Sequence, residues 1–203
     1  MSLKPLFITG IGTGVGKTII SSIVVEKLKA DYWKPIQSGD LHQSDTMKVK
    51  SLVSNSSTIF YPETYQLTQP LSPHLSAEID NLEIKLKDFI TPETNNQLVI
   101  EGAGGLMVPL NSKDLIIDLI KYLDAEVILV SQHYLGSINH TLLSIELLKS
   151  KGISIKGIVF NGDNQSSEDY ILNYSGVNKI GTIKELPIIN KETIKFAGKA
   201  LVL

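Results

Sequence analysis

A glycine-rich stretch followed by lysine and threonine lies near the amino terminus, where the chain reads Gly10-Ile11-Gly12-Thr13-Gly14-Val15-Gly16-Lys17-Thr18. Glycines allow successive backbone N–H groups to turn inward toward an anion. In loops of this kind the lysine reaches the β- and γ-phosphates of a nucleotide, and the next hydroxyl binds Mg²⁺. The stretch therefore predicts phosphate binding through Lys17, with Thr18 on the metal. The alternative is a glycine-rich turn that binds nothing.

The loop departs from its commonest form. The pattern GxxxxGK[ST] would place a glycine at position 11, where this chain has Ile11. This departure is typical of the P-loop proteins with a deviant Walker A loop. One part of that branch, the partitioning ATPases, carries a second lysine five residues before the main one, and here Gly12 stands at that position. The sequence therefore argues against a partitioning ATPase.

Two carboxylates are candidates for a metal site beside this loop. Glu101 ends the apolar run 97–100 and precedes Gly102-Ala103-Gly104-Gly105. A carboxylate at a strand end suits Mg²⁺, and the glycines allow a ligand to approach the backbone closely. The alternative is a strand followed by a tight turn. Asp45 is a second candidate ligand, but its spacing alone favours a helix cap by Ser44 or Asp45.

Three other segments carry polar groups that could contact a ligand. Lys34 and Ser38 follow a predicted strand and would lie at the carboxyl edge of an open sheet; taken alone, Lys34 is better explained as a solvated charge. The segment at 136–140 opens a helix whose N-terminus could hold a carboxylate, unless Ser137 simply caps it. Asn161 could pair with an adenine edge or start a turn.

Alternating strands and helices would position these residues. The apolar run 6–9 predicts a buried strand before the loop, and the spacing of apolar residues in 19–28 predicts a helix after it. Residues 54–80 are rich in Ser, Thr, Pro and Asn; their prolines exclude a long helix, and the stretch 68–74 predicts a shaped loop. The pattern indicates one parallel, three-layer α/β domain over 1–203. Further strands are expected at 32–36, 97–101, 127–130, 153–160 and 179–183, and helical spacing at 81–90, 115–123, 136–148, 167–174 and 191–202.

The composition excludes several classes of function. The chain of 203 residues is 42% hydrophobic and 20% charged, with a net charge of −2, which gives no electrostatic argument for binding nucleic acid or a membrane. It contains no cysteine, so disulfides, thiolate catalysis and cysteine metal sites are excluded. No apolar run approaches a membrane span of about 18 residues. We expect a soluble, cytoplasmic protein.

Taken in order, these motifs resemble those of the dethiobiotin synthetases, the ATP-dependent ligases of biotin synthesis. A phosphate loop alone is unspecific, whereas the ordered combination is highly specific and runs nearly end to end. The matching segments are Val15-Gly16-Lys17-Thr18, Lys-Pro-x-x-Ser-Gly at 34–39, Ser44-Asp45, Ser-Pro-His at 72–74, Glu-Gly-Ala-Gly-Gly at 101–105, Leu-Gly-x-Ile-Asn-His at 135–140 and Asn161.

The resemblance implies a P-loop NTPase fold and a role for each matching position. It implies that Mg²⁺ is bound by Thr18, Asp45 and Glu101, which favours the metal role of Asp45 over the cap. ATP and its metal would be held by Gly14, Val15, Gly16, Lys17, Thr18, Ile19, Asp45, Glu101, Gly102, Ala103, Gly104 and Asn161. The substrate would be held by Thr13, Lys34, Ser38, Gly104, Gly105 and Asn139. The implied catalytic residues are Lys34, Lys17 and Thr13.

The implied reaction joins CO₂ to 7,8-diaminopelargonic acid through a carbamate and a carbamic–phosphoric anhydride, followed by ring closure. In the family the helix start near Asn139 comes from the other subunit, which implies a homodimer with its active sites at the interface. One departure is Gly14, where some members carry an acidic residue, so a polar contact is not expected there. The segment after Ser167 is short and divergent, which weakens any inference about the base.

Two other functions compete with this one. A nucleotide-dependent switch or scaffold ATPase of the same branch would explain the loop and Glu101. It would not explain Lys34, Ser38 and the segment at 136–140 together. An amidotransferase-like ligase of related fold is a weaker alternative, because a chain without cysteine lacks a glutaminase nucleophile.

Overall fold

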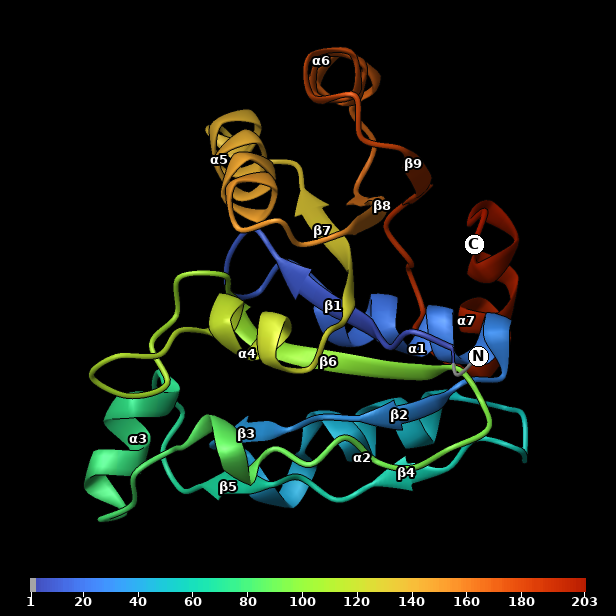
Figure 1. Cartoon of the computed structure of the whole chain (residues 1–203). Coiled ribbons are helices and arrows are strands. Elements are labelled where there is room, and N and C mark those ends of the chain that lie inside the picture. Colours follow the sequence, from blue (N-terminus) through green and yellow to red (C-terminus); the bar gives the residue numbers. More distant parts are fainter. Residues whose placement is uncertain (1–2) are drawn as a thin grey trace.

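The computed structural model describes residues 3–203 of the chain. Within this range seven strands form a parallel sheet in the order β4-β2-β6-β1-β7-β8-β9 (Figure 1). β1 lies in the middle of the sheet and is buried along its whole length, as expected for a strand covered on both faces. The strands are β1 (Leu6–Gly10), β2 (Asp31–Trp33), β4 (Phe60–Tyr61), β6 (Leu98–Gly105), β7 (Glu126–Gln132), β8 (Ile155–Asn161) and β9 (Lys179–Ile183).

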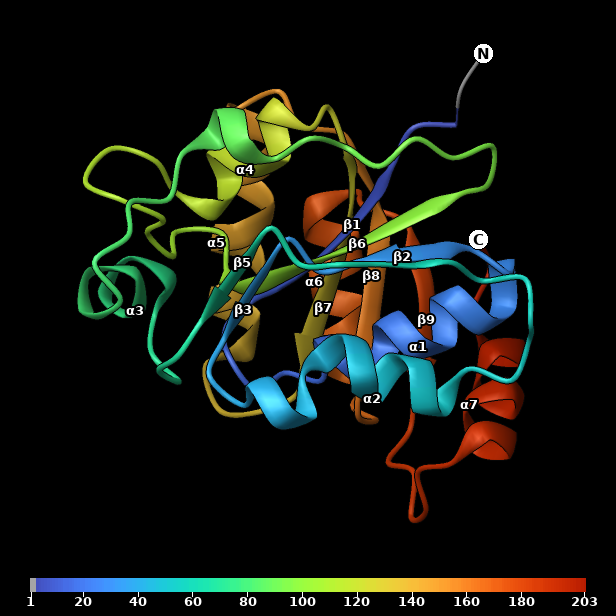
Figure 2. The ribbon, with the colours of Figure 1, turned by 90° about the horizontal axis from the view of Figure 1, so that it is seen from below.

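Helices cover both faces of this sheet. One face carries α1 (Lys17–Leu28), α2 (Asp45–Leu52) and α7 (Lys191–Ala197), and the other carries α4 (Ile116–Tyr122), α5 (Ser137–Ser150) and α6 (Gln165–Ser175). Figure 2 shows α4 and α5 on the opposite side of the strands from α1, α2 and α7. The predicted three-layer, mainly parallel α/β architecture is therefore confirmed.

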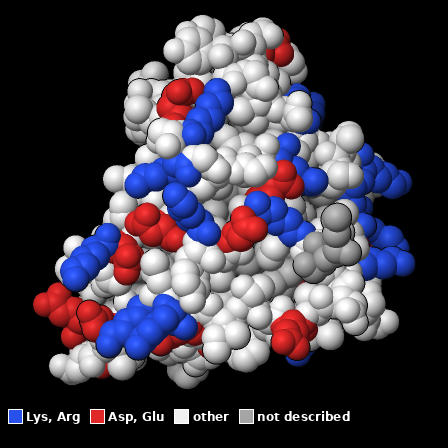
Figure 3. All heavy atoms as spheres, viewed as in Figure 1, with Lys and Arg blue, Asp and Glu red and all other residues white. Residues whose placement is uncertain are grey.

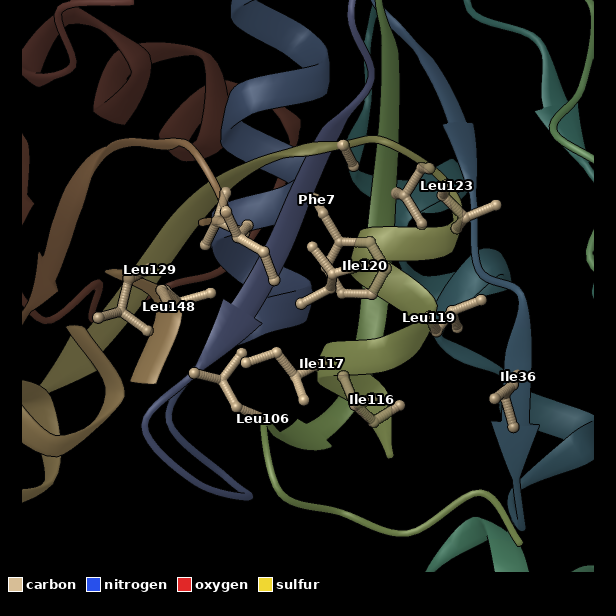
Figure 4. Packing of buried hydrophobic residues seen from close by; sticks show 14 of the residues in the cluster. Phe7, Ile36, Leu106, Ile116, Ile117, Leu119, Ile120, Leu123, Leu129 and Leu148 are labelled. Carbon is tan, nitrogen blue, oxygen red and sulfur yellow. The ribbon is translucent and has the colours of Figure 1, made fainter. Parts of the chain in front are cut away.

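Each face of the sheet has its own hydrophobic core. Along β1 the side chain of Phe7 packs toward α4 and α5, whereas Leu6 and Ile8 pack toward α1. Figure 4 shows Phe7 among the α4 residues Ile117 and Ile120. Burial of a side chain of this size contributes about 1.5–3 kcal/mol. Because alternate β1 side chains are buried in the two cores, the position of this strand in the sheet is fixed. The carboxyl end of the strand leads into the glycine-rich loop.

The strand predicted at 32–36 is wrong as a single element. β2 ends at Trp33, and the chain enters a different, two-stranded parallel sheet formed within the described chain by β3 (Ile36–Ser38) and β5 (Tyr65–Leu67). Pro35 separates the two strands and has no backbone N–H to donate to a ladder. Its carbonyl accepts hydrogen bonds from Thr64 and Tyr65 instead. Lys34 therefore lies between two sheets.

Other element boundaries also differ from those predicted. The segment 54–80 has no long helix, as expected, but contains β4, β5 and the short helix α3 (Pro73–Ile79), which begins inside the loop expected at 68–74. Proline is tolerated at this start because the first turn of a helix needs no N–H there. The helical spacing at 81–90 yields only the 3₁₀ turn Leu86–Asp88. The strand expected to end at Glu101 continues as β6 to Gly105, and the helix expected at 191–202 gives way to a 3₁₀ turn, Gly198–Ala200.

The surface carries charges of both signs. On the face shown in Figure 3, lysine side chains are interspersed with aspartate and glutamate. Within residues 3–203 we find no helix with the length and apolar character needed to cross a membrane.

Candidate active site

A cleft of about 1010 Å³ opens where β1, β2 and β6 end. Parallel α/β sheets bind ligands at this edge because the loops that follow the strands meet there. The cleft gathers most of the residues that the sequence singled out. Those lining it are Thr13, Gly14, Gly16, Lys17, Thr18, Ile19, Lys34, Ser38, Asp45, Glu101, Ala103 and Gly104.

The loop between β1 and α1 has the backbone expected of an anion cradle. Gly16 stands at the N-cap of α1 with φ of 91°, and no hydrogen bond from a side chain of the described residues caps this helix. The N–H groups of the first turn are therefore left for a ligand. Asn161 at the end of β8 donates from Nδ2 to the carbonyl of Val15 at 3.0 Å. A Cβ at Gly16 would lie 2.4 Å from that Nδ2, so the contact requires glycine.

Lys17 is nearly enclosed by this loop. Its side chain is 8% exposed, and its Nζ donates to the carbonyl of Gly12 at 2.9 Å. Burial, followed by repulsion from Lys34, lowers the pKa of Lys17 to about 8. An anion in the cleft would favour the charged ammonium again, because an opposite charge nearby raises the pKa of an amine.

A buried cluster of charges lies beside the loop. Glu101 is 1% exposed, and its Oε1 accepts hydrogen bonds from Thr18 Oγ1 at 2.9 Å and Lys34 Nζ at 3.2 Å. The same Lys34 Nζ lies 2.7 Å from Asp45 Oδ2. The three residues expected to bind metal thus meet in one place, and the Lys34 ammonium bridges the two carboxylates.

The electrostatic balance favours the charged forms of Lys34 and Asp45. Burial alone would lower the pKa of Lys34, but attraction to Glu101 and Asp45 outweighs it, so the pKa is raised. Burial likewise opposes ionisation of Asp45, yet Lys34 holds the pKa of its carboxyl below the usual value. The Lys34 ammonium is thus paired with two carboxylate side chains in this part of the cleft.

Ser44, and not Asp45, caps helix α2. The Ser44 side chain accepts the backbone N–H of Met47 at 3.3 Å. The Asp45 N–H donates to Gln37 Oε1 at 3.1 Å, a contact that the sequence did not indicate. The Asp45 carboxylate is therefore directed to Lys34 and the cleft instead of to the helix terminus.

Some of the predicted residues lie elsewhere. Asn139 is exposed near the start of α5 and outside the cleft. Gly105 lines a separate depression of about 390 Å³ beside α5, and Thr13 borders both hollows. Val15 and Gly102 are buried next to the loop and the sheet. Capping of α5 by Ser137 is wrong, since Gly136 stands at the N-cap with φ of 100° and no described side chain bonds to that end.

The chemistry of the donors suits Mg²⁺. Among the described residues there is no group of three or more His, Cys, Asp or Glu arranged to hold a metal. Mg²⁺ does not need one, because it is commonly bound through one or two carboxylates together with substrate phosphates and water. A cationic ammonium already lies between Asp45 and Glu101, which indicates that this position stabilises positive charge.

Comparisons with known proteins agree with this geometry. A family model described as an AAA domain matches residues 4–193. The chain is 56% identical to the ATP-dependent dethiobiotin synthetase of Christiangramia forsetii, over 95% of this chain and 93% of that protein. It is 47% identical to the enzyme of the same name from Cytophaga hutchinsonii, over 95% and 94% of the two chains. The chain belongs to the dethiobiotin synthetase family.

Solved structures place this dethiobiotin synthetase family member among P-loop ATPases by fold. The septum site-determining protein MinD of Pyrococcus horikoshii, complexed with Mg-ADP, superposes with a TM-score of 0.64 at 15% identity, covering 97% of this chain and 86% of that one. A ParA family ATPase from Chlorobium tepidum gives 0.56 at 14% identity, covering 98% and 100%. The fold expectation is confirmed. The family match decides against the switch or scaffold ATPase as the nearer relative.

Proposed function

We propose that this chain is a dethiobiotin synthetase, which uses ATP to convert 7,8-diaminopelargonic acid and CO₂ into the cyclic urea of dethiobiotin. The observation that carries the proposal is the position of Lys34, a buried ammonium held between Asp45 and Glu101 beside a phosphate loop. A phosphate loop suffices for nucleotide hydrolysis, whereas a second buried cation at its mouth suits an anionic second substrate. The names of the relatives support the same activity.

ATP would bind along the loop. The backbone from Gly14 to Ile19 would surround the phosphates, with Lys17 against the β- and γ-phosphates. Asn161 would contribute to the adenine site and, through its bond to Val15, would also support the loop. The β6 segment Gly102-Ala103-Gly104 would lie along the triphosphate on the opposite side.

Mg²⁺ would be held by Thr18, Asp45 and Glu101. Bound there, it would offset charge on the β- and γ-phosphates. The three donors are hard oxygen ligands already drawn together around Lys34, and they fit this ion.

The substrate would occupy the part of the cleft formed by Lys34, Ser38 and Thr13, next to Gly104 and Gly105. The Ser38 Oγ is buried and has no hydrogen-bond partner within residues 3–203. An unpaired buried hydroxyl is costly, so this atom is suited to bind a polar ligand. One amine of the diamine would take up CO₂ and lose a proton, giving a carbamate that Lys34 would stabilise.

Ring closure follows from positioning. The carbamate oxygen would attack the γ-phosphorus and release ADP, and Lys17 and Lys34 would offset the charge that develops on the transferred group. The second amine would then attack the carbamoyl carbon, forming the second C–N bond and expelling phosphate. No side chain would become covalently attached at any step.

The active unit would be a homodimer with its sites at the interface. Asn139 lies on the exposed start of α5, where it would hold the substrate carboxylate of the other subunit. Within one chain, a depression joins Thr13 and Gly105 to His140 of α5, so this part of α5 lies at the same end of the molecule as the cleft. We further propose that residues 1–203 form a single domain in the cytoplasm; residues 1 and 2 lie outside those described.

One assay tests the proposal directly. Purified protein with MgATP should release ADP only when both the diamine and bicarbonate are present, and mass spectrometry should find dethiobiotin in an amount equal to the ADP. ADP release that is independent of the diamine, without dethiobiotin, would support a nucleotide switch and reject the synthetase.

A further inference from the structure

A tyrosine that the sequence did not single out contacts the buried carboxylate of the cleft. Tyr32 lies on β2, which pairs with β6, and is fully buried. Its hydroxyl donates to Glu101 Oε2 at 2.9 Å. The ring packs against Phe60 of the neighbouring strand, with ring centroids 6.0 Å apart, so the hydroxyl is held from behind by the core of the protein.

The two oxygens of Glu101 have different surroundings. Oε1 accepts from Thr18 and Lys34 on the cleft side, whereas Oε2 accepts from Tyr32 on the side of the sheet. The donors on Oε1 are the groups that the proposed function redirects, Thr18 to the metal and Lys34 to the carbamate. Tyr32 cannot turn away in the same manner, because its ring is enclosed.

We propose that Tyr32 is a positioning residue, which fixes Glu101 Oε2 toward the sheet and thereby presents Oε1 alone to Mg²⁺. This inference rests on the proposed function. A hydrogen bond to the outer oxygen of a ligating carboxylate orients the ligand and limits it to one contact with the metal. The burial of Glu101 is a second reason for this role. If Thr18 and Lys34 turn to other ligands, Tyr32 remains as a hydrogen-bond donor to the buried carboxylate, which would otherwise carry a desolvation penalty.

The tyrosine remains a donor under working conditions. Burial, reinforced by the negative charge of Glu101, raises the pKa of Tyr32 well above its ordinary value. The neutral hydroxyl can therefore donate a hydrogen bond throughout the neutral range without adding a charge to the cluster.

The test compares Tyr32→Phe with a matched control, Tyr61→Phe. Tyr61 lies on the neighbouring strand β4, and its hydroxyl donates to the carbonyl of Glu93 at the surface. Mn²⁺ binding to the protein–ADP complex, measured by electron paramagnetic resonance, should weaken by about tenfold or more in Tyr32→Phe, the scale found for lost second-layer contacts. ADP binding in EDTA should equal that of the wild type in both variants, and Tyr61→Phe should bind Mn²⁺ normally.

A second comparison separates positioning from stability. Adding Tyr32→Phe to Glu101→Gln should cost less than about a further twofold in Mn²⁺ affinity, because a residue that acts through Glu101 has nothing left to position. The double variant has no carboxylate at position 101 that could be left without a donor, so it tests the inference even if Tyr32→Phe alone folds poorly. Normal Mn²⁺ affinity in Tyr32→Phe, whatever its melting temperature, would overturn the inference, as would an equal further loss in the Glu101→Gln background.

The outcomes also distinguish this inference from the function on which it rests. If the wild type forms dethiobiotin and Glu101→Gln weakens Mn²⁺ binding, a normal Tyr32→Phe rejects only the positioning role. If the wild type forms none, or Glu101→Gln binds Mn²⁺ as the wild type does, the proposed function or its metal site is rejected and the role of Tyr32 is rejected with it.

Discussion

Replacing Lys34 by methionine should expose how much the cleft depends on its internal cation. Methionine keeps an unbranched side chain of similar length but removes the charge. Because Lys34 Nζ lies 2.7 Å from Asp45 Oδ2 and 3.2 Å from Glu101 Oε1, the two carboxylate oxygens are at most about 6 Å apart. Removing one partner of a buried ion pair costs about 3–5 kcal/mol, because the charge that remains is left uncompensated.

This uncompensated charge gives the expected change in stability. A loss of about 3–5 kcal/mol lowers the melting temperature of a chain of this size by about 6–20 °C. The pKa of Asp45 is lowered in the native protein, so the pairing with Lys34 stabilises the wild type above the unfolded pKa and is lost as the pH falls through the folded one. The difference between wild type and variant should therefore be large near pH 7 and shrink as the pH falls below the ordinary aspartate value of 3.8. Mg²⁺ should restore part of it, by replacing the lost ammonium.

The same variant should lose catalysis more than nucleotide binding. Removing one electrostatic stabiliser of a transition state costs roughly 10²-fold or more in kcat, while ADP affinity measured by calorimetry should stay near that of the wild type. Differential scanning calorimetry at several pH values and steady-state kinetics test both parts. Normal kcat with weakened ADP binding would move Lys34 to the nucleotide site, and an unchanged melting temperature at pH 7 would refute the electrostatic reasoning.

Three further predictions concern the loop, the metal and the interface. Lys17→Ala should abolish turnover, and because the pKa of Lys17 is lowered to about 8, wild-type ADP affinity should fall as the pH rises above 8; a flat profile from pH 7 to 9.5 would contradict this. Asp45→Asn should need more Mg²⁺ for half-maximal activity, since it loses an anionic ligand, and a titration that overlays the wild type would leave Asp45 outside the metal site. When inactive Lys17→Ala is mixed with inactive Asn139→Asp, each heterodimer should show about half the activity of a wild-type dimer, because one of its two shared sites is intact. No recovery after demonstrated subunit exchange would place the carboxylate site within one chain.

The main features of the cleft could be predicted because strand ends converge. Glycine spacing identified the phosphate loop, and the apolar run before Glu101 placed this carboxylate at the same sheet edge. The spacing of residues could not indicate that Lys34 contacts Glu101 directly, because an isolated lysine at a strand end is usually solvated. Here the break at Pro35 and the pairing of β2 with β6 direct it into the cleft.

Other features depend on contacts between distant parts of the chain. The strands β3 and β5 have three residues each, too few to show a period, so the second sheet could not be found from the pattern. The bond from Asn161 to Val15 joins residues 146 positions apart, and that from Tyr32 to Glu101 depends on strand register. At 81–90 the apolar residues suggested a helix, but Ile84 and Phe89 are the ones buried, and their separation of five residues does not match one helical face.

Strand β6 joins the core to the cleft through two adjacent residues. Glu101 enters the cleft, while at Gly102 an added Cβ would lie 2.6 Å from Cε1 of Phe7, the ring that fills the opposite face of β1. Any side chain at position 102 would push against that ring and, through the backbone, displace the carboxylate beside it. The two positions should therefore covary: a related chain with alanine at 102 should carry a residue smaller than phenylalanine at 7, and a Gly102→Ala enzyme should regain activity when Phe7→Leu is added.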